Sequence, residues 1–510
     1  MRKYPIGIQD FRKIREEGYL YVDKTEIIYR LLMRGSYYFL SRPRRFGKSL
    51  LLSTIHEIFS GSRELFKGLW IDNNWDWDKT NPVIHFKFSK SDYQELGLRQ
   101  ALMSELDKSA TILNITLSKP SLKERFEELI LKASVNAKIV LLIDEYDKPI
   151  IDYLEQPDKA NENREILKQF YSIIKDSDPY IRFLLFTGVS KFSKVSIFSD
   201  LNNLSDITFH PQFNALGGIT QQELETNFSE EIKSFSEHNP SVLNDVKLWY
   251  NGYTWNGKQT VYNPFSLLRF IESGQFENYW FSTGTPTFLV NFIRQAGKFT
   301  LDEEEYTSLS SLSQFDINHL EFKPMLFQTG YLTFSEVNFS EDSCKLRYPN
   351  KEVKASLEQY LLAAYRHTQL GEALPLVLMM RDAFNNNDID QVITIINTAF
   401  STIPYDLWRG ATELHYHALV HLTFSLLGSY IQSEVHSANG RCDALVQTDK
   451  YIFALEFKLD KSAEEALEQI ELKEYLTPFR LSPQQKIAIG INFSSEHKKV
   501  ENYLVQVLEG

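Results

Sequence analysis

The stretch SRPRRFGKSLLLSTIHEIFSG, residues 41–61, decides how the N-terminal part of the chain folds. The preceding YYFLS, residues 37–41, is an apolar run typical of a buried strand. LLLSTIHEIFSG repeats apolar residues at helical spacing until Gly61. Between strand and helix lies Gly-Lys-Ser, and backbone N–H groups at such a helix N-terminus bind anions. The stretch therefore predicts a strand, a phosphate-binding loop and a helix.

The loop departs from the usual phosphate-loop pattern GxxxxGK[ST] at one position, because Arg42 stands where the first glycine is expected. Gly47, Lys48 and Ser49 keep the positions that contact phosphate and magnesium, whereas the first glycine mainly eases the turn. The alternative is an incidental Gly-Lys-Ser before a surface helix, which the strand and helix context disfavours. We expect nucleotide binding by the whole loop, namely Arg42, Pro43, Arg44, Arg45, Phe46, Gly47, Lys48 and Ser49.

A magnesium site needs a second oxygen ligand, and AKIVLLIDEYD, residues 137–147, supplies one. Its apolar run predicts a strand that is covered on both faces and ends at Asp144. Asp144 is then expected to share Mg²⁺ with Ser49, and Glu145 to polarise the attacking water. A strand that merely runs into a turn is the common alternative. The phosphate loop and the strand candidate PVIHFKFS, residues 82–89, favour the metal site.

A third strand candidate, IRFLLFTGVSKFSK, residues 181–194, ends in polar residues. Thr187 and Ser190 are candidates for sensing the terminal phosphate of the nucleotide. A buried strand with a capping hydroxyl explains either residue equally well. Thr187 is taken as a further nucleotide-binding candidate.

The composition indicates a multidomain globular protein of 510 residues with a net charge of −12. Its two cysteines, Cys344 and Cys442, form neither a disulfide framework nor a metal motif. No apolar run is long enough for a membrane span, and the first residues do not resemble a secretory signal. We expect a cytoplasmic protein without membrane contact. Its overall charge repels nucleic acid, so binding requires local basic patches such as residues 1–60, with twelve Lys and Arg against six Asp and Glu.

The middle of the chain changes from α/β alternation to mainly helical patterns near residue 211. It begins with the capping signature TQQEL, residues 220–224. Two aromatic stretches follow, LWYNGYTW at 248–255 and ENYWFSTGTPTFLV at 277–290. No cluster of Lys or Arg accompanies them, so packing is a better interpretation than base stacking. The pattern predicts a helical lid and a helical connector.

The C-terminal region, residues 411–508, has a regular order of expected elements. It predicts a small mixed sheet with flanking helices. The expected elements are a helix (411–428), three strands (430–437, 441–448 and 451–458), a helix (462–476), a strand (486–494) and a last helix.

The strand YIFALEFK, residues 451–458, places two polar side chains on one face. Because side chains alternate, Glu456 and Lys458 point the same way, and Asp443 on the preceding strand comes alongside. Asp443 and Glu456 are expected to hold Mg²⁺ for phosphodiester cleavage, with Lys458 stabilising the developing charge. The alternative is a solvated ion pair, but the apolar flanks make this strand central and buried.

Several motifs together resemble one family. YPIGIQDF, YVDKT, FLSRPRRFGKSLL, ELFKGLWID, LLIDEYD, FTGVSKFS, YNGYTW and NPFSLL are similar to those of bacterial AAA-type, ATPase-like proteins with a C-terminal nuclease. In that family the loop ordinarily reads RPRRFGKS, which implies that Arg42 belongs to a variant loop. Asp443, Glu456 and Lys458, in the order D-x(12)-ExK and followed by a helix bearing Gln469, resemble the PD-(D/E)XK nuclease signature. The resemblance implies that Gln469 is a further catalytic residue and Glu434 a further metal ligand.

The resemblance implies a multidomain α/β protein. We expect a P-loop NTPase domain of AAA type (1–210), a helical lid and connector (211–405), and a restriction-endonuclease-like α/β domain (406–510). ATP and Mg²⁺ are the expected cofactors, with Mg²⁺ at both sites. DNA or RNA is the expected partner, and assembly into a homo-oligomer is left open.

The hypothesis is an ATP-hydrolysing protein with a metal-dependent nuclease domain. One alternative is an ATP-operated switch whose nuclease-like domain binds a partner or nucleic acid without cutting. Another is an active nuclease whose ATPase turns over slowly, as a timer. Residues 411–510 hold nine Lys and Arg against fourteen Asp and Glu, which weighs against simple binding of phosphates.

Overall fold

The computed structural model describes residues 2–191, 197–198, 201–280, 289–290, 292–293, 305–313, 316–317, 320–366, 369–401, 413–428, 432–435 and 443–508, without the side chains of 370, 413–417 and 432–435. The chain divides into two compact units. The first comprises residues 1–284 and 302–353, and the second comprises 285–301 and 354–510. The three-part division drawn from the sequence, with boundaries at 210 and 405, stays a prediction.

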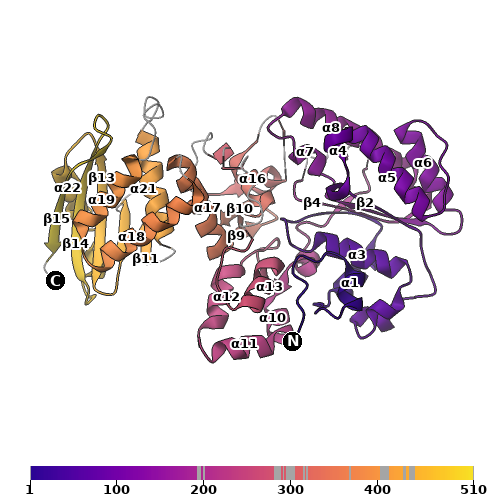
Figure 1. Ribbon diagram of the computed structural model, residues 1–510, viewed down its shortest axis with the longest axis horizontal. Coiled ribbons are helices and arrows are strands. Elements are labelled where there is room, and N and C mark those ends of the chain that lie inside the picture. The colour runs from indigo at the N-terminus through magenta and orange to yellow at the C-terminus, as the bar shows by residue number, and fades with distance from the viewer. Residues whose placement is uncertain are drawn as a thin grey trace. The chain divides into compact units, whose positions relative to one another are not determined.

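The first unit is built around a parallel five-stranded sheet of order β2-β3-β4-β1-β5 (Figure 1). The strand order places β4 between β1, which leads into the loop, and β3, which ends at Asp144. All carboxyl ends therefore meet at one edge, where α/β sheets bind ligands. Besides the strand before the loop, the sequence analysis predicts three further strands, and β2, β3 and β4 confirm them. The strands are β1 (Tyr37–Ser41), β2 (Val83–Lys87), β3 (Ile139–Asp144), β4 (Ile181–Gly188) and β5 (Ser205–Asp206).

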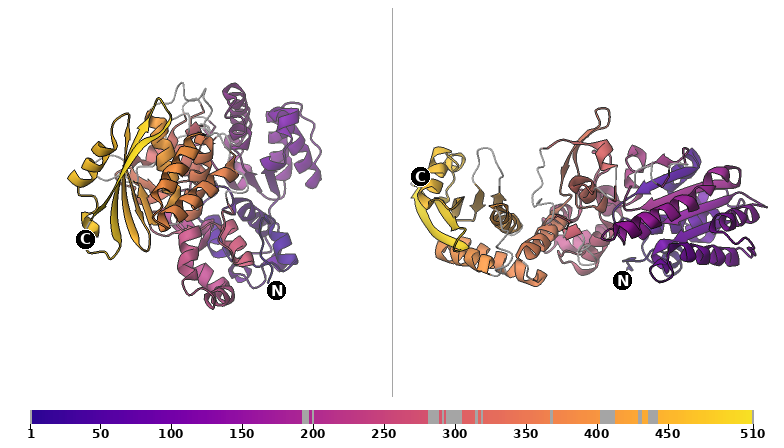
Figure 2. Two further views of the ribbon diagram at one scale, coloured as in Figure 1. Left: turned by 60° about the vertical axis from the view of Figure 1, so that its left-hand side comes forward. Right: turned by 90° about the horizontal axis from the view of Figure 1, so that it is seen from above.

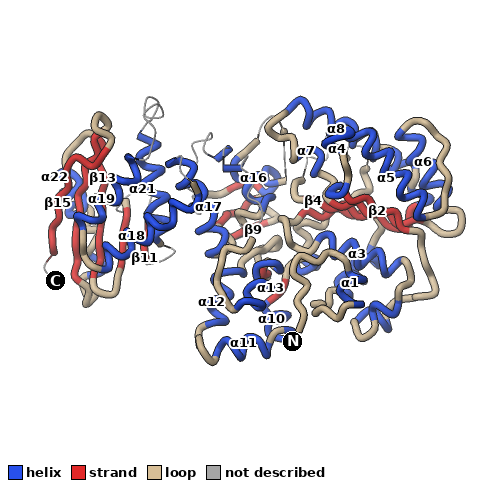
Figure 3. The backbone as a smooth tube through the Cα atoms, viewed as in Figure 1, coloured by secondary structure: helices blue, strands red, loops and turns tan. Residues whose placement is uncertain are grey.

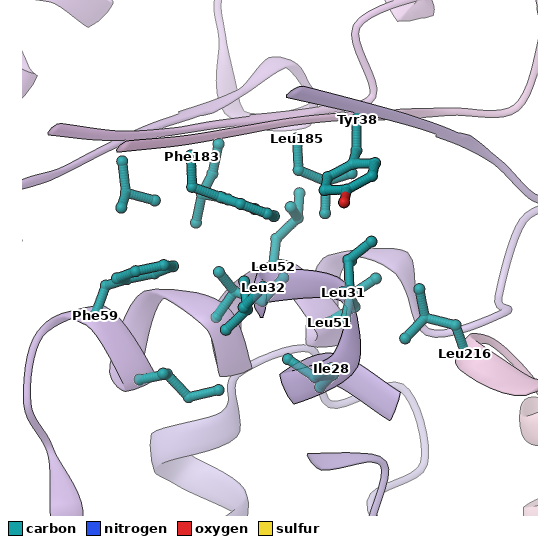
Figure 4. Close-up of a cluster of buried hydrophobic side chains, with 14 of the residues drawn as sticks. Ile28, Leu31, Leu32, Tyr38, Leu51, Leu52, Phe59, Phe183, Leu185 and Leu216 are labelled. Carbon is teal, nitrogen blue, oxygen red and sulfur yellow. The ribbon is translucent and has the colours of Figure 1, made fainter. Parts of the chain in front are cut away.

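Helices cover both faces of this sheet (Figures 1 and 3). On one face, α2 and α3 pack apolar side chains such as Leu31 and Leu52 against Tyr38 and Phe183 of the strands (Figure 4). On the other face, Phe86 of β2 packs against aromatic rings of α6 and α8. The helices of the first face are α1 (Phe11–Glu16), α2 (Thr25–Arg34) and α3 (Lys48–Phe59). The connections after β2 and β3 form α4 (Tyr93–Leu96), α5 (Leu98–Ile112), α6 (Leu122–Ala133), α7 (Lys148–Ile151), α8 (Pro157–Tyr171) and α9 (Ile173–Asp176).

Residues 211–284 and 302–353, which also belong to the first unit, are here called the lid region. Its first helix begins at the expected capping box, in which Thr220 and Glu223 exchange hydrogen bonds. Tyr250, Tyr253 and Trp255 are buried, which confirms the packing interpretation of this aromatic stretch. The helices are α10 (Gln221–Asn227), α11 (Ser229–Ser236), α12 (Val242–Tyr250), α13 (Pro264–Ser273), α15 (Leu309–Leu312) and α16 (Phe322–Thr329).

The helical stretches expected after residue 211 are present, but this region also contains two small antiparallel sheets that the sequence analysis does not predict. In β10, Cys344 and Leu346 are buried while the residues between them are half-exposed, which is the alternation of a strand with one covered face. The sequence analysis does not separate these short alternating runs between turns from the helical pattern around them. The strands are β6 (Ile219–Thr220) with β7 (Val261–Tyr262), and β8 (Thr307–Ser308), β10 (Ser343–Arg347) and β9 (Thr333–Asn338).

The second unit holds a mixed sheet of order β11-β12-β13-β14-β15, in which β13 and β14 run parallel. Helices cover both faces of this sheet (Figure 2). α18, α19 and α21 pack on one face, and α22 packs on the other. Phe384, Phe400 and Phe424 of the first group pack on rings of β13 and β14, and Ile470 of α22 packs from the opposite side. The strands are β11 (Gln432–Val435), β12 (Ala444–Gln447), β13 (Tyr451–Leu459), β14 (Gln485–Ser494) and β15 (Lys499–Leu508). The helices are α18 (Ala373–Asn385), α19 (Ile389–Ser401), α21 (Glu413–Leu427) and α22 (Ala463–Leu472).

The last element of the chain corrects the sequence analysis, which predicted a helix after residue 494. Residues 499–508 form β15, an antiparallel partner of β14 along almost its whole length. Val500, Val505 and Val507 are β-branched and Tyr503 is aromatic, and such residues favour a strand when a neighbouring strand is available. The pairing with β14 decides the element, and it is not visible in the local pattern.

Gly490 of β14 allows α22 to lie close to the sheet. A Cβ atom at this position would lie 2.2 Å from the Ala463 carbonyl oxygen and 2.9 Å from the Leu467 amide nitrogen. Both are backbone atoms of α22, so neither can move without the helix. Gly490→Ala is therefore expected to lower the free energy of unfolding of the second unit by about 1–3 kcal/mol. Thermal and urea unfolding of the full chain measure the effect.

Gly371→Ala is the matched control, since a Cβ atom there meets nothing within 4 Å. We expect this variant to unfold like the wild type. Equal stability of the two variants would contradict the close packing of α22 on β14.

Candidate functional site

The loop between β1 and α3 has the backbone shape of an anion cradle. Gly47 caps the N-terminus of α3 in the left-handed conformation, with φ 78°, and no side chain caps this helix end. Arg45 is also left-handed, with φ 67°. Such a conformation is strained for a residue with a side chain, and strained residues gather at functional sites. The free N–H groups at the start of α3 are therefore available to a negatively charged ligand.

Lys48, the first residue of α3, lies buried inside the loop. Its ammonium nitrogen donates to the carbonyl oxygens of Arg42, at 2.8 Å, and Pro43, at 2.9 Å. Burial lowers the pKa of Lys48, and Asp144 is the strongest of the nearby carboxylates that oppose this shift. Two neutral carbonyl oxygens thus hold the lysine within the loop, and phosphate oxygens would compete with them for its ammonium.

Arg42 is the residue that replaces the first glycine, and its side chain is 1% exposed. Its guanidinium donates to the carbonyl oxygens of Ser41 and Thr208, both at 2.9 Å, and of Phe213, at 3.2 Å. It also lies 4.0 Å from the centre of the Trp255 ring. Burial lowers the pKa of Arg42 to about 9. The side chain is committed to the protein interior, so a nucleotide-binding role for the Arg42 guanidinium is not supported.

The other loop residues divide between the lid region and solvent. The Phe46 ring packs edge-on against Tyr253 at 4.7 Å between ring centres, and the Arg45 guanidinium lies 3.7 Å from the Phe265 ring. Pro43 is buried, whereas the Arg44 side chain is exposed. Arg44 and Gly47 therefore have the most open positions for a ligand, and Pro43 and Phe46 offer it only their backbone.

Carboxylates gather where β3 ends beside β4. Asp144 is buried, and its Oδ1 accepts a hydrogen bond from the Thr187 hydroxyl at 2.7 Å. Glu145 follows in the left-handed conformation, with φ 54°, and burial, then the Asp144 charge, raises its pKa. Asp147 is also buried, and its Oδ2 accepts from the amides of Val189 and Ser190. These groups are electrostatically coupled to Lys48 across the strand ends.

The Thr187 hydroxyl lies at the position expected from the sequence, between the loop strand and the Asp144 strand, because Leu40 of β1 is its register partner. Ser190 contributes its backbone amide to Asp147. Ser49 is half-buried in the first turn of α3.

A cavity of about 100 Å³ opens beside the loop. Segments that lie far apart in the sequence line it with mainly apolar residues, so sequence motifs do not reveal it. At its edge, Lys24 and Glu223 form an ion pair of 2.6 Å. The apolar residues that line the cavity are Pro5, Leu20, Tyr21, Val22, Ile28, Phe46, Leu50, Leu51, Leu216, Ile219, Pro264 and Leu268.

A second site lies in the other unit, between β13 and α22. The Lys458 ammonium donates to Glu456 Oε1 at 3.0 Å and to Gln469 Oε1 at 2.6 Å. The Gln469 amide in turn donates to Glu456 Oε1 and, at 3.3 Å, to the Tyr475 hydroxyl. The side chains that the sequence singled out on β13 and α22 thus form one hydrogen-bonded group.

Asp443 joins this group from the start of β12. Its Oδ2 accepts from the Phe457 amide at 2.8 Å, which holds the carboxylate against β13. Glu456 is 2% exposed, and its Oε2 has no hydrogen-bond partner among the described residues. Burial, then the Asp443 charge, raises the pKa of Glu456, and Lys458 opposes the shift.

The donor set of the second site fits a divalent cation. A buried carboxylate oxygen without a partner is costly, and a cation next to it removes this cost. Two carboxylates are enough for Mg²⁺, which keeps several waters. The Glu434 side chain lies outside the described residues. Among the residues that the structure describes, no group of three or more His, Cys, Asp or Glu is placed to hold a metal ion.

Two residues were missed at these sites by the sequence analysis. Asp147 belongs to the quoted LLIDEYD motif, so its position was visible but its contact with β4 was not. Tyr475 lies in the expected helix 462–476 and contacts Gln469 from beyond the end of α22. Neither carries a local signal that separates it from an ordinary polar residue.

Comparisons with known proteins match both regions. Residues 5–198 match a family described as predicted AAA-ATPase, and residues 411–503 match the PD-(D/E)XK nuclease superfamily. The chain is 38% identical over 522 residues, covering 99% of both chains, to the "Uncharacterized protein in vnfD 5'region" of Azotobacter chroococcum mcd 1. No solved structure matches. Within the described part of the chain, no helix is both long and apolar enough to cross a membrane.

The buried carboxyl of Asp147 gives a test of this site through pH. Burial raises its pKa from 3.8 to about 6, so the folded state binds a proton that the unfolded state has already released between these values. The stability that the protonated Asp147 carboxyl gives to the folded state is fully present below about pH 4, and it is lost as the pH rises through 6. Asp147→Asn keeps an oxygen for the two amides and carries no charge. The variant is expected to gain about 2–3 kcal/mol over the wild type at pH 7 and little at pH 4.

Unfolding of both proteins at a series of pH values measures this difference. A difference that stays constant from pH 4 to 7 would show that the pKa of Asp147 is the same in the folded and the unfolded chain, so that burial does not raise it.

Proposed function

Since the chain belongs to the family of predicted AAA-ATPases with a C-terminal PD-(D/E)XK nuclease superfamily domain, we propose that it hydrolyses ATP and cleaves phosphodiester bonds of DNA or RNA. The observation that best supports the nuclease proposal is the buried Glu456 carboxylate. One of its oxygens is unpartnered, and the other is hydrogen-bonded to Lys458 and Gln469.

At the first site, the loop would bind the phosphates of ATP. The α3 amides and the Lys48 ammonium are the groups that neutralise phosphate charge, and Ser49 with Asp144 would hold Mg²⁺. Glu145 would accept a proton from the attacking water, a role that its raised pKa supports. Thr187 orients Asp144 through their hydrogen bond.

The cavity beside the loop supports a nucleotide rather than a free phosphate. Its apolar walls suit a flat aromatic base, and it borders Gly47 and Leu50 at the start of α3. Phe46, a loop residue, contributes to its wall. The base and the phosphates would thus be bound by adjoining parts of one site.

At the second site, Asp443 and Glu456 would hold Mg²⁺, which supplies an activated water and charge neutralisation when bound. Lys458 carries a positive charge beside Glu456 and would stabilise the phosphorane-like transition state. Gln469 fixes the orientations of both side chains by donating to one and accepting from the other. The overall acidity of residues 411–510 means that further positive charge for nucleic acid would come from outside this region.

The nuclease proposal is tested by cleavage of labelled single- and double-stranded DNA and RNA in Mg²⁺ or Mn²⁺. Glu456→Gln keeps the shape of the side chain and removes the charge, so cleavage should fall by about 100-fold or more. Glu464→Gln is the matched control, because Glu464 lies exposed in the first turn of α22. Cleavage that survives Glu456→Gln would refute the site. If the wild type cuts nothing, an ATP-operated switch becomes the better proposal.

The ATPase proposal has a separate test. Glu145→Gln removes the proton acceptor while Lys48 and the loop stay intact, so phosphate release should fall by about 100-fold with ATP binding kept within a few-fold. Lys48→Ala should weaken binding itself. Fluorescent-nucleotide titration and a phosphate-release assay distinguish the two effects. Equal turnover by wild type and Glu145→Gln would remove Glu145 from the mechanism.

A further inference from the structure

The phosphate loop is in contact with the lid region along its whole length. Arg42 contacts Trp255, Arg45 contacts Phe265, and Phe46 contacts Tyr253 and Trp255. Gly330 allows Pro43 to come close, since a Cβ atom there would lie 2.6 Å from the proline ring. A movement of residues 42–46 therefore cannot occur without a response of the lid region.

Trp280 connects this loop to a buried carboxyl group. Its indole N–H donates to the Arg44 carbonyl oxygen at 3.2 Å, and its backbone N–H donates to Glu352 Oε1 at 2.7 Å. The same Glu352 oxygen accepts from the Ser266 hydroxyl at 3.1 Å. Glu352 is fully buried and Trp280 nearly so. One residue thus contacts both the backbone of the phosphate loop and the carboxyl of Glu352.

Glu352 lies in the first turn of α17 (Lys351–Arg366), the helix that begins in the first unit and ends in the second. Further along α17, Glu358 Oε1 accepts a hydrogen bond of 2.5 Å from the Ser425 hydroxyl of α21. Next to Ser425, the Phe424 ring lies 5.7 Å from the ring of Phe457. Phe457 stands on β13 between Glu456 and Lys458. Contacts within each unit and one continuous helix therefore join the two sites.

A change at the loop is expected when a nucleotide binds. Lys48 donates to the carbonyl oxygens of Arg42 and Pro43 in this structure, and phosphate oxygens compete for the same ammonium. When Lys48 donates to phosphate instead, the carbonyl oxygens of Arg42 and Pro43 lose their hydrogen bonds to it. These two residues directly precede Arg44, whose carbonyl oxygen accepts from the Trp280 indole. The loop would then have one arrangement without nucleotide and another with it, and coupling between sites requires two such arrangements.

We propose that Trp280 and Glu352 transmit nucleotide binding at the phosphate loop to α17 and thereby regulate the site on β13. The inference rests on the proposed function, to which it adds the route of regulation. Trp280 is a positioning residue, since it acts through the Arg44 carbonyl and Glu352. It is not expected to touch nucleotide or nucleic acid.

The experiment measures hydrogen exchange of α17 amides in the full chain with and without Mg·ATP, alongside ATP affinity. In the wild type, ATP should change the exchange rates of α17 by about fivefold or more. Trp280→Phe removes the indole donor and keeps the backbone N–H, so this change should largely disappear while ATP affinity stays within a few-fold. Glu352→Ala should have the same effect, and Glu352→Gln, which keeps an acceptor oxygen, should restore it.

Trp77→Phe is the matched control. The Trp77 indole also donates to a backbone carbonyl, that of Asp72 at 2.9 Å, away from the loop. This variant should respond to ATP like the wild type. A response of α17 that persists in Trp280→Phe, or that is absent from wild type with ATP bound, overturns the inference and leaves the proposed function standing.

Cleavage assays complete the comparison. The ratio of cleavage rates with and without ATP should approach one in Trp280→Phe, with its rate without ATP unchanged. If no variant cuts nucleic acid but α17 still responds to ATP through Trp280, the transmission is supported and the nuclease proposal fails. If ATP does not bind to the wild type, both proposals fall.

Discussion

A buried guanidinium without a carboxylate in its hydrogen bonds holds the phosphate loop in place. The two terminal nitrogens of Arg42 donate to three backbone carbonyls, and the guanidinium lies against the Trp255 ring. Its Nε has no hydrogen-bond partner among the described residues. Burial of a charge is costly, and the lowered pKa of Arg42 reflects this cost. The carbonyls and the ring face offset part of it, because each places negative potential next to the cation. The position of the loop therefore depends on the strand end and the lid region together.

This arrangement explains why the loop tolerates a large residue at the usual glycine position. Arg42 is not among the residues with positive φ, whereas Arg45 and Gly47 are. The turn is thus displaced to later positions in the loop, and the first position is free to carry a side chain. That side chain reaches the carbonyls of Thr208 and Phe213 and the Trp255 ring, so this loop has an anchor where a glycine would allow a flexible turn.

In the second unit, the site depends on the close approach of a helix to the sheet. Gly490 lies beside Glu456 in the register of β13 and β14, and its missing Cβ lets α22 contact the sheet backbone. Gln469 then reaches both Glu456 and Lys458. Three polar groups share a buried space in which each satisfies another, which is the condition for keeping charged residues in a core. The remaining partnerless oxygen of Glu456 distinguishes this group from a closed ion pair.

The sequence by itself determined strands β1 to β4 and β11 to β14, the loop and the carboxylates at the end of β3, because apolar periodicity and glycine placement are local signals. It also placed Glu456 and Lys458 on one face, since alternation along a strand needs no partner. It could not reveal the apolar cavity beside the loop, the contacts of Asp147 with the residues after β4, or the Trp280 contacts, because these join segments distant in the chain. The helix predicted from the sequence at the position of β15 is wrong, because strand pairing with β14 decides this element and the local pattern does not show it. Only the tertiary structure decided that Arg42 is an anchor, because a buried charge is stable only where distant carbonyls and a ring converge on it.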